Sequence, residues 1–383
     1  MAIISKDRAS ELVLKHGFSG SYQKKQVTFL LKRTYIEPID TIKKERLIQS
    51  GEKHYSQMIS VESAPTERHL QLFEQAMQQG QQRLAKEVQQ LAQALVSHFT
   101  APIVLVSFVR AGVPLGVLLY HAIRDLGYEC IHYGISIIRD RGIDFAALET
   151  IIAKHGHDSI VFVDGWTGKG AIRQELQRSL SNDSRFNGKP IPLVVLSDIA
   201  GCAWLAASGE DWLIPSGILG STVSGLISRS ICEGEVLSAK ELNANNIDQW
   251  HSCIEYPHLK EFDTSQQFIE QINQLRRSLK SQSNAVWTEA YQQVQQTQSQ
   301  HVIRELAKKY NIQNINRIKP SIAEATRAIL RRVPELVLLR DADDPDTALL
   351  RHLTCITKTP VQIVGDQIAP YKAITLIQNL GKG

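Results

Sequence analysis

The most informative stretch of the sequence is IVFVDGWTGKGA at residues 160–171. Its first four residues, Ile160–Val163, are all apolar, which predicts a strand buried on both faces. From Ala171 onward the apolar spacing predicts a helix that begins directly after the loop. The first amide N–H groups of a helix have no intrahelical partner, so they can bind a phosphate group. The loop is therefore either a phosphate-binding cradle or an ordinary turn between a strand and a helix.

Strands and helices alternate on both sides of this stretch. The expected strands are 103–108, 130–138, 160–163, 193–196 and 212–214, and the expected helices are 66–98, 113–126, 145–154 and 171–181. Strands that alternate with helices are joined by right-handed crossovers. The pattern therefore predicts an α/β protein with a parallel sheet and helices on both faces.

A second, smaller alternation begins at residue 301. Ser321 and Glu324 fit a capping box at the start of a helix expected at 322–332. Strands are expected at 336–339 and 361–364. Together these elements predict a compact α/β/α unit at the C-terminus.

The composition is that of a folded protein without a membrane span. The 383 residues are 43% apolar and 21% charged, and no run of about 18 apolar residues occurs. This length exceeds one typical core, and we expect two domains, residues 1–285 and 286–383. The five cysteines are widely spaced, which favours reduced thiols in a cytoplasmic protein. Residues 301–383 carry 13 Lys and Arg against 8 Asp and Glu, which indicates either a polyanionic partner or a solvated basic face.

Polar loops that contain glycine follow several of the expected strands. In an open parallel sheet, ligands bind beyond the carboxyl ends of the strands. Arg110–Gly112 follow the strand at 103–108, and Pro215–Ser221 follow the one at 212–214. Arg110 would supply a bidentate ligand for an anion, although a structural ion pair suits it as well. Several such loops on one edge predict a site that binds two phosphate groups.

These loops resemble those of a known enzyme family. Residues 107–113, SFVRAGV, resemble the pyrophosphate-binding loop of uracil-type phosphoribosyltransferases, and Ile138-Arg139-Asp140 resembles the Tyr-Arg-Asp stretch that follows it there. Residues 160–171 are similar to the family signature, in which four apolar residues precede an acidic pair and Thr-Gly. The resemblance implies a type I phosphoribosyltransferase-like fold. It also implies a magnesium-dependent transferase that makes or cleaves an N-ribosyl phosphate bond.

The resemblance further implies roles for individual residues. Asp164, Arg110 and Arg139 would be catalytic. Asp164 would also contact a magnesium ion held mostly by substrate oxygens. The substrate is expected to be phosphoribosyl pyrophosphate or a nucleotide. Its expected contacts are Ala111, Gly112, Asp140, Trp166, Thr167, Gly168, Lys169, Gly170, Ala171, Ser216 and Gly217.

Nearly the whole chain is similar to a narrower group of bacterial proteins. In that group a phosphoribosyltransferase-like domain precedes a C-terminal Pelota/L7Ae-like RNA-binding domain, and the genes belong to tellurium-resistance and stress-response clusters. The resemblance implies RNA as a partner of the C-terminal unit, and it leaves a homodimer open. The residues expected to contact RNA phosphates are Arg317, Lys319, Arg327, Arg331 and Arg332.

Two other functions stay open. Gly165 stands where the transferase signature has a second acid, so the protein could instead sense a nucleotide without catalysis while its C-terminal unit holds RNA. Some relatives carry a cysteine-protease label, so the third hypothesis is a cysteine hydrolase. Cys202 on the expected loop edge would be its nucleophile, and such a thiol needs a base within hydrogen-bond reach. The candidate bases are His54, His132, His155 and His157, and no spacing in the sequence selects one.

Overall fold

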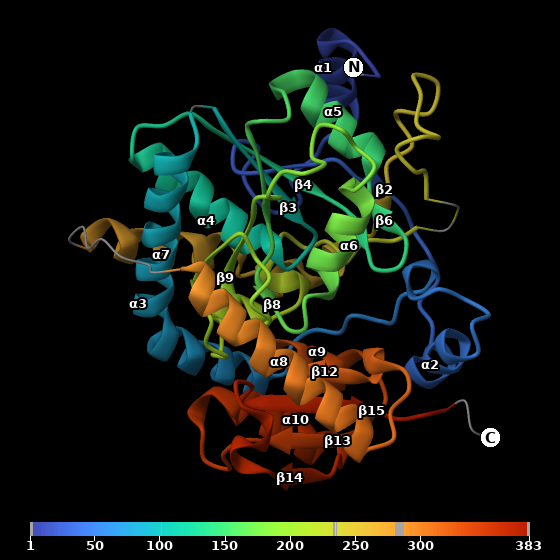
Figure 1. Ribbon diagram of the computed structural model, residues 1–383, viewed down its shortest axis with the longest axis vertical. Coiled ribbons are helices and arrows are strands. Elements are labelled where there is room, and N and C mark those ends of the chain that lie inside the picture. Colours follow the sequence, from blue (N-terminus) through green and yellow to red (C-terminus); the bar gives the residue numbers. More distant parts are fainter. Residues whose placement is uncertain (1–2, 101, 233, 235, 280–286, 381–383) are drawn as a thin grey trace.

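A computed structural model describes residues 3–100, 102–232, 234, 236–279 and 287–380 (Figure 1). The described chain forms a seven-stranded sheet in the order β1-β4-β3-β7-β9-β10, with β8 added beside β9. Every strand pair in it is parallel. The strands are β1 (Thr28–Phe29), β3 (Ile103–Phe108), β4 (Cys130–Ile135), β7 (Ile160–Val163), β8 (Trp166–Thr167), β9 (Leu193–Asp198) and β10 (Leu205–Ser208).

Helices cover both faces of this sheet. Successive strand residues point to opposite faces, so neighbouring residues of one strand pack against different helical layers. Leu105 and Val163 pack against the layer formed by α3, α4 and α7, whereas Val104 and Phe162 pack against the layer formed by α1, α5 and α6. The helices are α1 (Lys6–His16), α3 (Glu67–His98), α4 (Gly112–Asp125), α5 (Phe145–His155), α6 (Ala171–Leu180) and α7 (Ser265–Ser278). The expected parallel sheet between two helical layers is confirmed.

Smaller elements surround the sheet. Two short strand pairs are β2 (Lys32–Arg33) with β11 (Ser252–Cys253), and β5 (Ile137–Ile138) with β6 (Gly142–Ile143). The helix α2 and the 3-10 helix η1 precede α3. Their bounds, with those of the other 3-10 helices, are α2 (Thr41–Gln49), η1 (Tyr55–Gln57), η2 (Pro215–Gly217), η3 (Ser221–Val223), η4 (Pro257–Phe262), η5 (Ile315–Arg317), η6 (Pro345–Thr347) and η7 (Gly365–Ile368).

The C-terminal unit is a small sheet between helices. Its strand order is β12-β15-β13-β14, in which β15 runs antiparallel to β12 and β13. Val302, Ile303 and Leu306 of α8 pack on one face of this sheet, and α9 and α10 cover the other. The elements are α8 (Glu289–Lys309), β12 (Ile318–Pro320), α9 (Ile322–Arg331), β13 (Pro334–Leu339), α10 (Ala348–Thr357), β14 (Val361–Ile363) and β15 (Ala373–Ile377). This confirms the expected α/β/α arrangement.

Two of the strand predictions are wrong. Residues 212–214 form a tight turn, in which the N–H of Ile214 donates to the carbonyl of Trp212, and the strand after β9 is β10. The expected strand 130–138 is interrupted at Ser136, whose carbonyl accepts the N–H of Asp144. The expected domain boundary between residues 285 and 286 lies outside the described residues, so the division into domains stays a prediction, as does the type I phosphoribosyltransferase fold. In the described part of the chain, no helix is long and apolar enough to cross a membrane.

The C-terminal unit, coloured orange to red in Figure 1, lies against the end of the large sheet, and α8 runs across the junction. The carboxylate of Asp211 accepts the N–H groups of Ile322, at 3.0 Å, and of Lys372, at 2.9 Å. The hydroxyl of Tyr371 donates to the carbonyl of Gly168 at 2.8 Å. The C-terminal unit is therefore seated on the loops at the carboxyl edge of the large sheet.

Candidate functional sites

A cavity of about 360 Å³ lies between the carboxyl edge of the large sheet and helix α9. We call it the cationic pocket, because nine Lys and Arg side chains line it beside only two carboxylates, those of Asp164 and Glu324. The nine cations are Lys44, Arg110, Arg139, Lys169, Arg229, Lys319, Arg327, Arg331 and Arg332. Charged side chains are seldom buried without partners, so this excess of positive charge needs a physical reason.

Arg110 forms part of the pocket wall, and only 4% of its surface is exposed. Its Nη1 donates to a carboxylate oxygen of Glu62 at 2.9 Å and to the carbonyl of Ile227 at 3.0 Å. Burial alone would raise the pKa of Glu62, but Arg110 and Arg331 lower it to about 2. The guanidinium of Arg110 is thus engaged in a structural ion pair, the alternative that the sequence left open.

Helix α9 turns its basic face toward this pocket. The guanidinium carbon of Arg327 lies 4.6 Å from the ring centroid of Trp166. Burial, and then the charge of Arg331, lower the pKa of Arg327 to about 9. Burial and neighbouring cations hold the pKa of Lys319 well below its usual range. Residues expected to contact RNA at the surface therefore face the N-terminal unit instead.

Asp164 and Arg139 also line the pocket. Burial raises the pKa of Asp164 to about 7, although the N–H of Gly165 donates to its Oδ1 at 2.8 Å. The Nε of Arg139 lies 3.0 Å from Asp140 Oδ2, and its guanidinium carbon lies 5.3 Å from the ring centroid of Tyr55. The structure thus brings the three predicted catalytic residues to one cavity, while their roles stay predictions.

The predicted phosphate cradle after β7 is covered by the C-terminal unit. The hydroxyl of Thr167 donates to the carboxylate of Asp198 at 2.5 Å. The Nζ of Lys169 donates to two backbone carbonyls of the C-terminal unit, at 2.7 and 2.8 Å. The carboxylate of Glu324 occupies the space that a side chain on Gly168 would need. The hydroxyl of Thr167 and the ammonium of Lys169 therefore already make internal contacts in this arrangement.

The other predicted contact residues divide between the pocket and its surroundings. Gly112 packs against the backbone of Val163, where a side chain would not fit. Arg317 pairs with Glu335 at 2.8 Å, away from the pocket. Ala111, Trp166 and Ala171 line the pocket, whereas Gly112, Asp140, Thr167, Gly168, Gly170, Ser216 and Gly217 are not part of its described lining.

The carboxylates of the pocket do not form a metal cage. Among the described residues, no group of three or more His, Cys, Asp and Glu side chains is placed to hold a metal ion. Asp164 and Glu324 are two carboxylates among nine cations, so a magnesium ion here would need oxygens from a ligand. Magnesium binding stays a prediction.

The thiol of Cys202 lies on the loop after β9. Its Sγ is 3.7 Å from Asp198 Oδ1, and its N–H donates to Oδ2 of the same carboxylate at 2.7 Å. Burial, and then the charge of Asp198, raise the pKa of this thiol well above its usual value. In the described residues, no histidine forms a hydrogen bond with it. The nucleophile expected from the sequence is therefore protonated and has no histidine base.

Three of the four candidate histidines are held by structural partners. The contacts are His132 Nε2 to Ser107 Oγ at 2.7 Å, His155 Nε2 to Tyr133 Oη at 2.9 Å, and His157 Nε2 to Asp158 Oδ1 at 3.1 Å. None of these contacts involves a cysteine, so these three rings are not placed as thiol bases.

The fourth histidine, His54, lies in a turn beside Cys232. The N–H of Cys232 donates to the carbonyl of Ser56 at 3.0 Å, and the hydroxyl of Ser56 lies 2.8 Å from His54 Nδ1. The Nε2 of His54 is buried and has no hydrogen-bond partner in the described chain. Burial, and then the charge of Arg141, lower the pKa of His54 to about 4, which keeps the ring neutral at pH 7. Cys232 is 8% exposed and donates its thiol to the carbonyl of Gly234 at 3.3 Å.

The sequence analysis missed Cys232. The pairing of Cys232 with the turn of His54 joins distant parts of the chain, so no local spacing could reveal it. Burial raises the pKa of the Cys232 thiol, so the thiol is protonated until a base accepts its proton.

Comparisons with known proteins bear on both units. Residues 20–273 match a family described as tellurite-like stress resistance cysteine protease StiP, and residues 297–379 match the PELOTA RNA binding domain. A curated relative from Acinetobacter baylyi, named Cysteine protease StiP, is 82% identical over 383 residues, which cover 100% of both chains. No solved structure matches the chain.

These comparisons correct the main functional prediction. The expected phosphoribosyltransferase is wrong, because the family and the relative that covers the full chain are both described as cysteine proteases, which are hydrolases. The expected link to tellurium and stress resistance agrees with the family description, and the expected Pelota-type unit is confirmed. The chain belongs to the StiP family and carries a C-terminal Pelota RNA-binding domain.

Proposed function

We propose that the protein is a cysteine peptidase in which Cys232 is the nucleophile and His54 is its base. One observation carries the assignment of residues. The turn that holds His54 is hydrogen-bonded to the backbone of Cys232, and the buried Nε2 of His54 has no hydrogen-bond partner in the described chain. The name of the Acinetobacter relative supports the reaction class.

The proposed reaction follows from these two groups. The Nε2 of His54 accepts the thiol proton, and the Sγ of Cys232 attacks the carbonyl carbon of a peptide bond. The C–N bond breaks as the imidazolium returns the proton to the leaving amine, and water then hydrolyses the thioester. A neutral imidazole suits this task, and the low pKa of His54 provides it at pH 7. In the resting structure the thiol donates to Gly234, so Sγ must turn toward the ring when substrate binds.

Arg141 is a cation whose charge acts on both His54 and Cys232. Its Nη1 lies 3.2 Å from the carbonyl oxygen of Gly234 and 3.5 Å from that of Cys232. A guanidinium at this position would stabilise the negative charge that develops on the substrate carbonyl oxygen. We therefore assign Arg141 the role of oxyanion donor in the proposed reaction.

The test is hydrolysis of unfolded casein and of a fluorogenic peptide mixture. We expect Cys232→Ser and His54→Gln to reduce the rate by about a thousandfold or more, because nucleophile and base act as one unit. Cys202→Ser and the exposed Cys355→Ser are the matched controls and should retain the wild-type rate. Thermal unfolding of each variant checks that the fold is intact.

Two outcomes would contradict this proposal. If the wild-type protein hydrolyses no peptide, the reaction class is wrong. If Cys232→Ser keeps the full rate while Cys202→Ser loses it, the nucleophile is the thiol on the loop after β9, and a base other than histidine activates it.

We also propose that the C-terminal unit binds RNA, since it matches the PELOTA RNA binding domain. In the present arrangement Lys319, Arg327, Arg331 and Arg332 face the cationic pocket, so RNA must use other residues of this unit. Fluorescence anisotropy with a labelled single-stranded RNA should show affinity that falls with salt. Arg327→Met should leave this affinity unchanged. A loss of RNA binding in this variant would show that α9 moves away from the cationic pocket and contacts RNA.

A further inference from the structure

The cationic pocket contains more positive charge than the protein neutralises. In the described residues, four of its nine cations form ion pairs: Arg110 and Arg331 with Glu62, Arg139 with Asp140, and Arg332 with Glu45. The other five, Lys44, Lys169, Arg229, Lys319 and Arg327, form no ion pair with any described carboxylate. Burial of unpaired cations is costly, so the arrangement is unfavourable unless an anion completes it.

A buried donor also lacks a partner here. The Nε of Arg110 is buried and makes no hydrogen bond in the described chain, whereas Nη1 donates to Glu62 and Ile227, and Nη2 lies 2.8 Å from Glu62 Oε1. Native proteins rarely leave buried donors unsatisfied. Lys44, Lys169 and Arg229 donate to neutral hydroxyl or carbonyl oxygens, which do not cancel their charge. The unsatisfied donor and the five cations without a carboxylate partner therefore indicate a missing acceptor that is anionic.

We propose that the cationic pocket binds a small ligand that carries two or three linked phosphate groups, and that both structural units hold it. Lys44 and Arg229 come from the N-terminal unit, and Lys319 and Arg327 come from the C-terminal unit. A volume of about 360 Å³ suits a small molecule. The five cations without an ion pair call for several negative charges, which linked phosphates supply in a compact form.

The pocket adjoins a second cavity of different character. This cavity, of about 350 Å³, shares Lys44, Arg110, Arg229 and Arg331 with the pocket. Its further lining includes Ile59, Leu219, Leu259 and the ring of Tyr256, whose buried hydroxyl has no hydrogen-bond partner in the described chain. An organic group attached to the phosphates would fit there. A nucleotide and an inorganic polyphosphate are thus the two sources of the same phosphate chemistry.

Binding should also change the protonation of the pocket. Burial, with neighbouring arginines, lowers the pKa of Lys44 to about 7, and burial lowers the pKa of Lys169 to about 8. A bound polyanion favours the charged form of both side chains, so it raises these pKa values. At about pH 8 the protein should therefore take up protons when the ligand binds.

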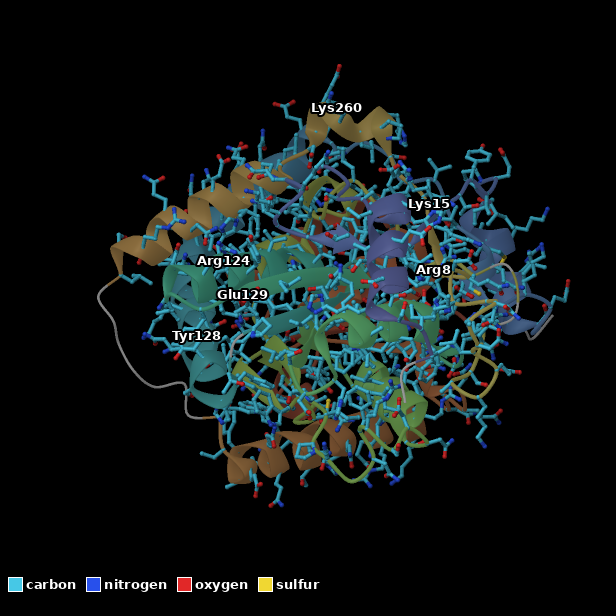
Figure 2. All side chains as sticks on the ribbon, turned by 90° about the horizontal axis from the view of Figure 1, so that it is seen from above. Arg8, Lys15, Arg124, Tyr128, Glu129 and Lys260 are labelled. Atoms are coloured by element: carbon cyan, nitrogen blue, oxygen red, sulfur yellow. The ribbon has the colours of Figure 1, made fainter. Side chains whose placement is uncertain are left out.

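The test is isothermal titration of the full chain with inorganic tripolyphosphate, in two buffers of different ionisation enthalpy. We expect one ligand per chain and net proton uptake at about pH 8. Lys319→Met and Lys44→Met should each weaken binding about tenfold or more, since each removes one charge from the site. The exposed Lys260, labelled in Figure 2, provides the matched control Lys260→Met, which should bind as the wild type does.

Titration with a nucleoside triphosphate distinguishes a nucleotide from an inorganic polyphosphate as the ligand. Tighter binding than tripolyphosphate, reduced by Tyr256→Ala, would identify a nucleotide, whereas equal binding would identify the phosphates alone. No binding of either compound, or equal weakening by Lys260→Met, would overturn the proposal. The thermal midpoint of each ligand-free variant shows that a loss of binding is not a loss of fold. Failure here would leave the proposed peptidase untouched, because neither Cys232 nor His54 lines the pocket.

Discussion

The cationic pocket and the cluster around Arg185 are both buried groups of charge, but they are built differently. Arg185 donates to Asp183 at 2.9 Å through Nε and also pairs with Glu149, so one cation meets two carboxylates. The pocket has nine cations and two carboxylates. The first cluster lies within the N-terminal unit, whereas the second lies where two units meet. Internal pairing therefore serves stability, and unpaired charge at the junction is available for binding.

Removing Arg185, the cation that pairs with two carboxylates, should have the largest effect on stability. Arg185→Met would leave the buried carboxylates of Glu149 and Asp183 without their ion-pair partner. Breaking a buried pair in this way costs about 3–5 kcal/mol. Urea unfolding followed by circular dichroism should show a loss of this size.

Arg8 provides the matched control for that experiment. Its side chain is 47% exposed and pairs with Glu11, which is 61% exposed, on the same helix. An exposed pair contributes about 0–1 kcal/mol, so Arg8→Met should barely move the unfolding midpoint. Equal losses in the two variants would mean that the Arg185 cluster owes nothing to its burial.

The junction between the units should have the second largest effect. Asp211 accepts the N–H groups of Ile322 and Lys372, so Asp211→Ala leaves two amides without an acceptor. Each unsatisfied buried donor costs about 1–3 kcal/mol, and we expect a total loss of about 2 kcal/mol after water reaches the site. Asp211→Asn keeps one acceptor oxygen and should lose about half as much. An unchanged midpoint for Asp211→Ala in thermal unfolding would show that the junction does not depend on this carboxylate.

The sequence predicted the helices and strands of both units better than it predicted the contact between the units. The apolar run Ile160–Val163 and the helical period of 66–98 specify β7 and α3, because burial on two faces and on one face leave distinct patterns. The spacing of Arg327 and Arg331 placed both on one face of α9. It could not show that this face meets the N-terminal unit, since that depends on contacts such as those of Asp211.

The sequence could not predict the candidate catalytic pair, Cys232 and His54, for a similar reason. His54 was among the predicted bases, but Cys202 was chosen as the thiol because it follows a strand at the expected loop edge. Position at a strand end says nothing of which histidine lies nearby. Only the fold brings the backbone of Cys232 to the turn of His54.

The unpaired pocket should have a smaller effect, which depends on pH. The pKa of Lys44 is about 7 in the folded protein and 10.5 as its ordinary value. Between these values the unfolded chain binds one proton more, so stability rises with pH, by at most about 1.4 kcal/mol per unit. Between about pH 7 and 8.5 we expect the ligand-free protein to gain about 1–2 kcal/mol from this side chain. The Arg185 cluster affects stability at acidic pH instead. The pKa of Asp183 is lowered in the folded protein, so the stability that its charged form contributes is lost as the pH falls below the ordinary value of 3.8.

Urea unfolding at the two pH values, on wild type, Lys44→Met and Lys260→Met, measures this contribution. Lys44→Met should flatten the rise, because methionine keeps the volume of the side chain and cannot bind a proton. Lys260→Met should follow the wild type, since Lys260 is exposed. If Lys44→Met rises as steeply as the wild type, Lys44 is already paired in solution, and the contrast between the matched cluster and the unmatched pocket fails at this residue.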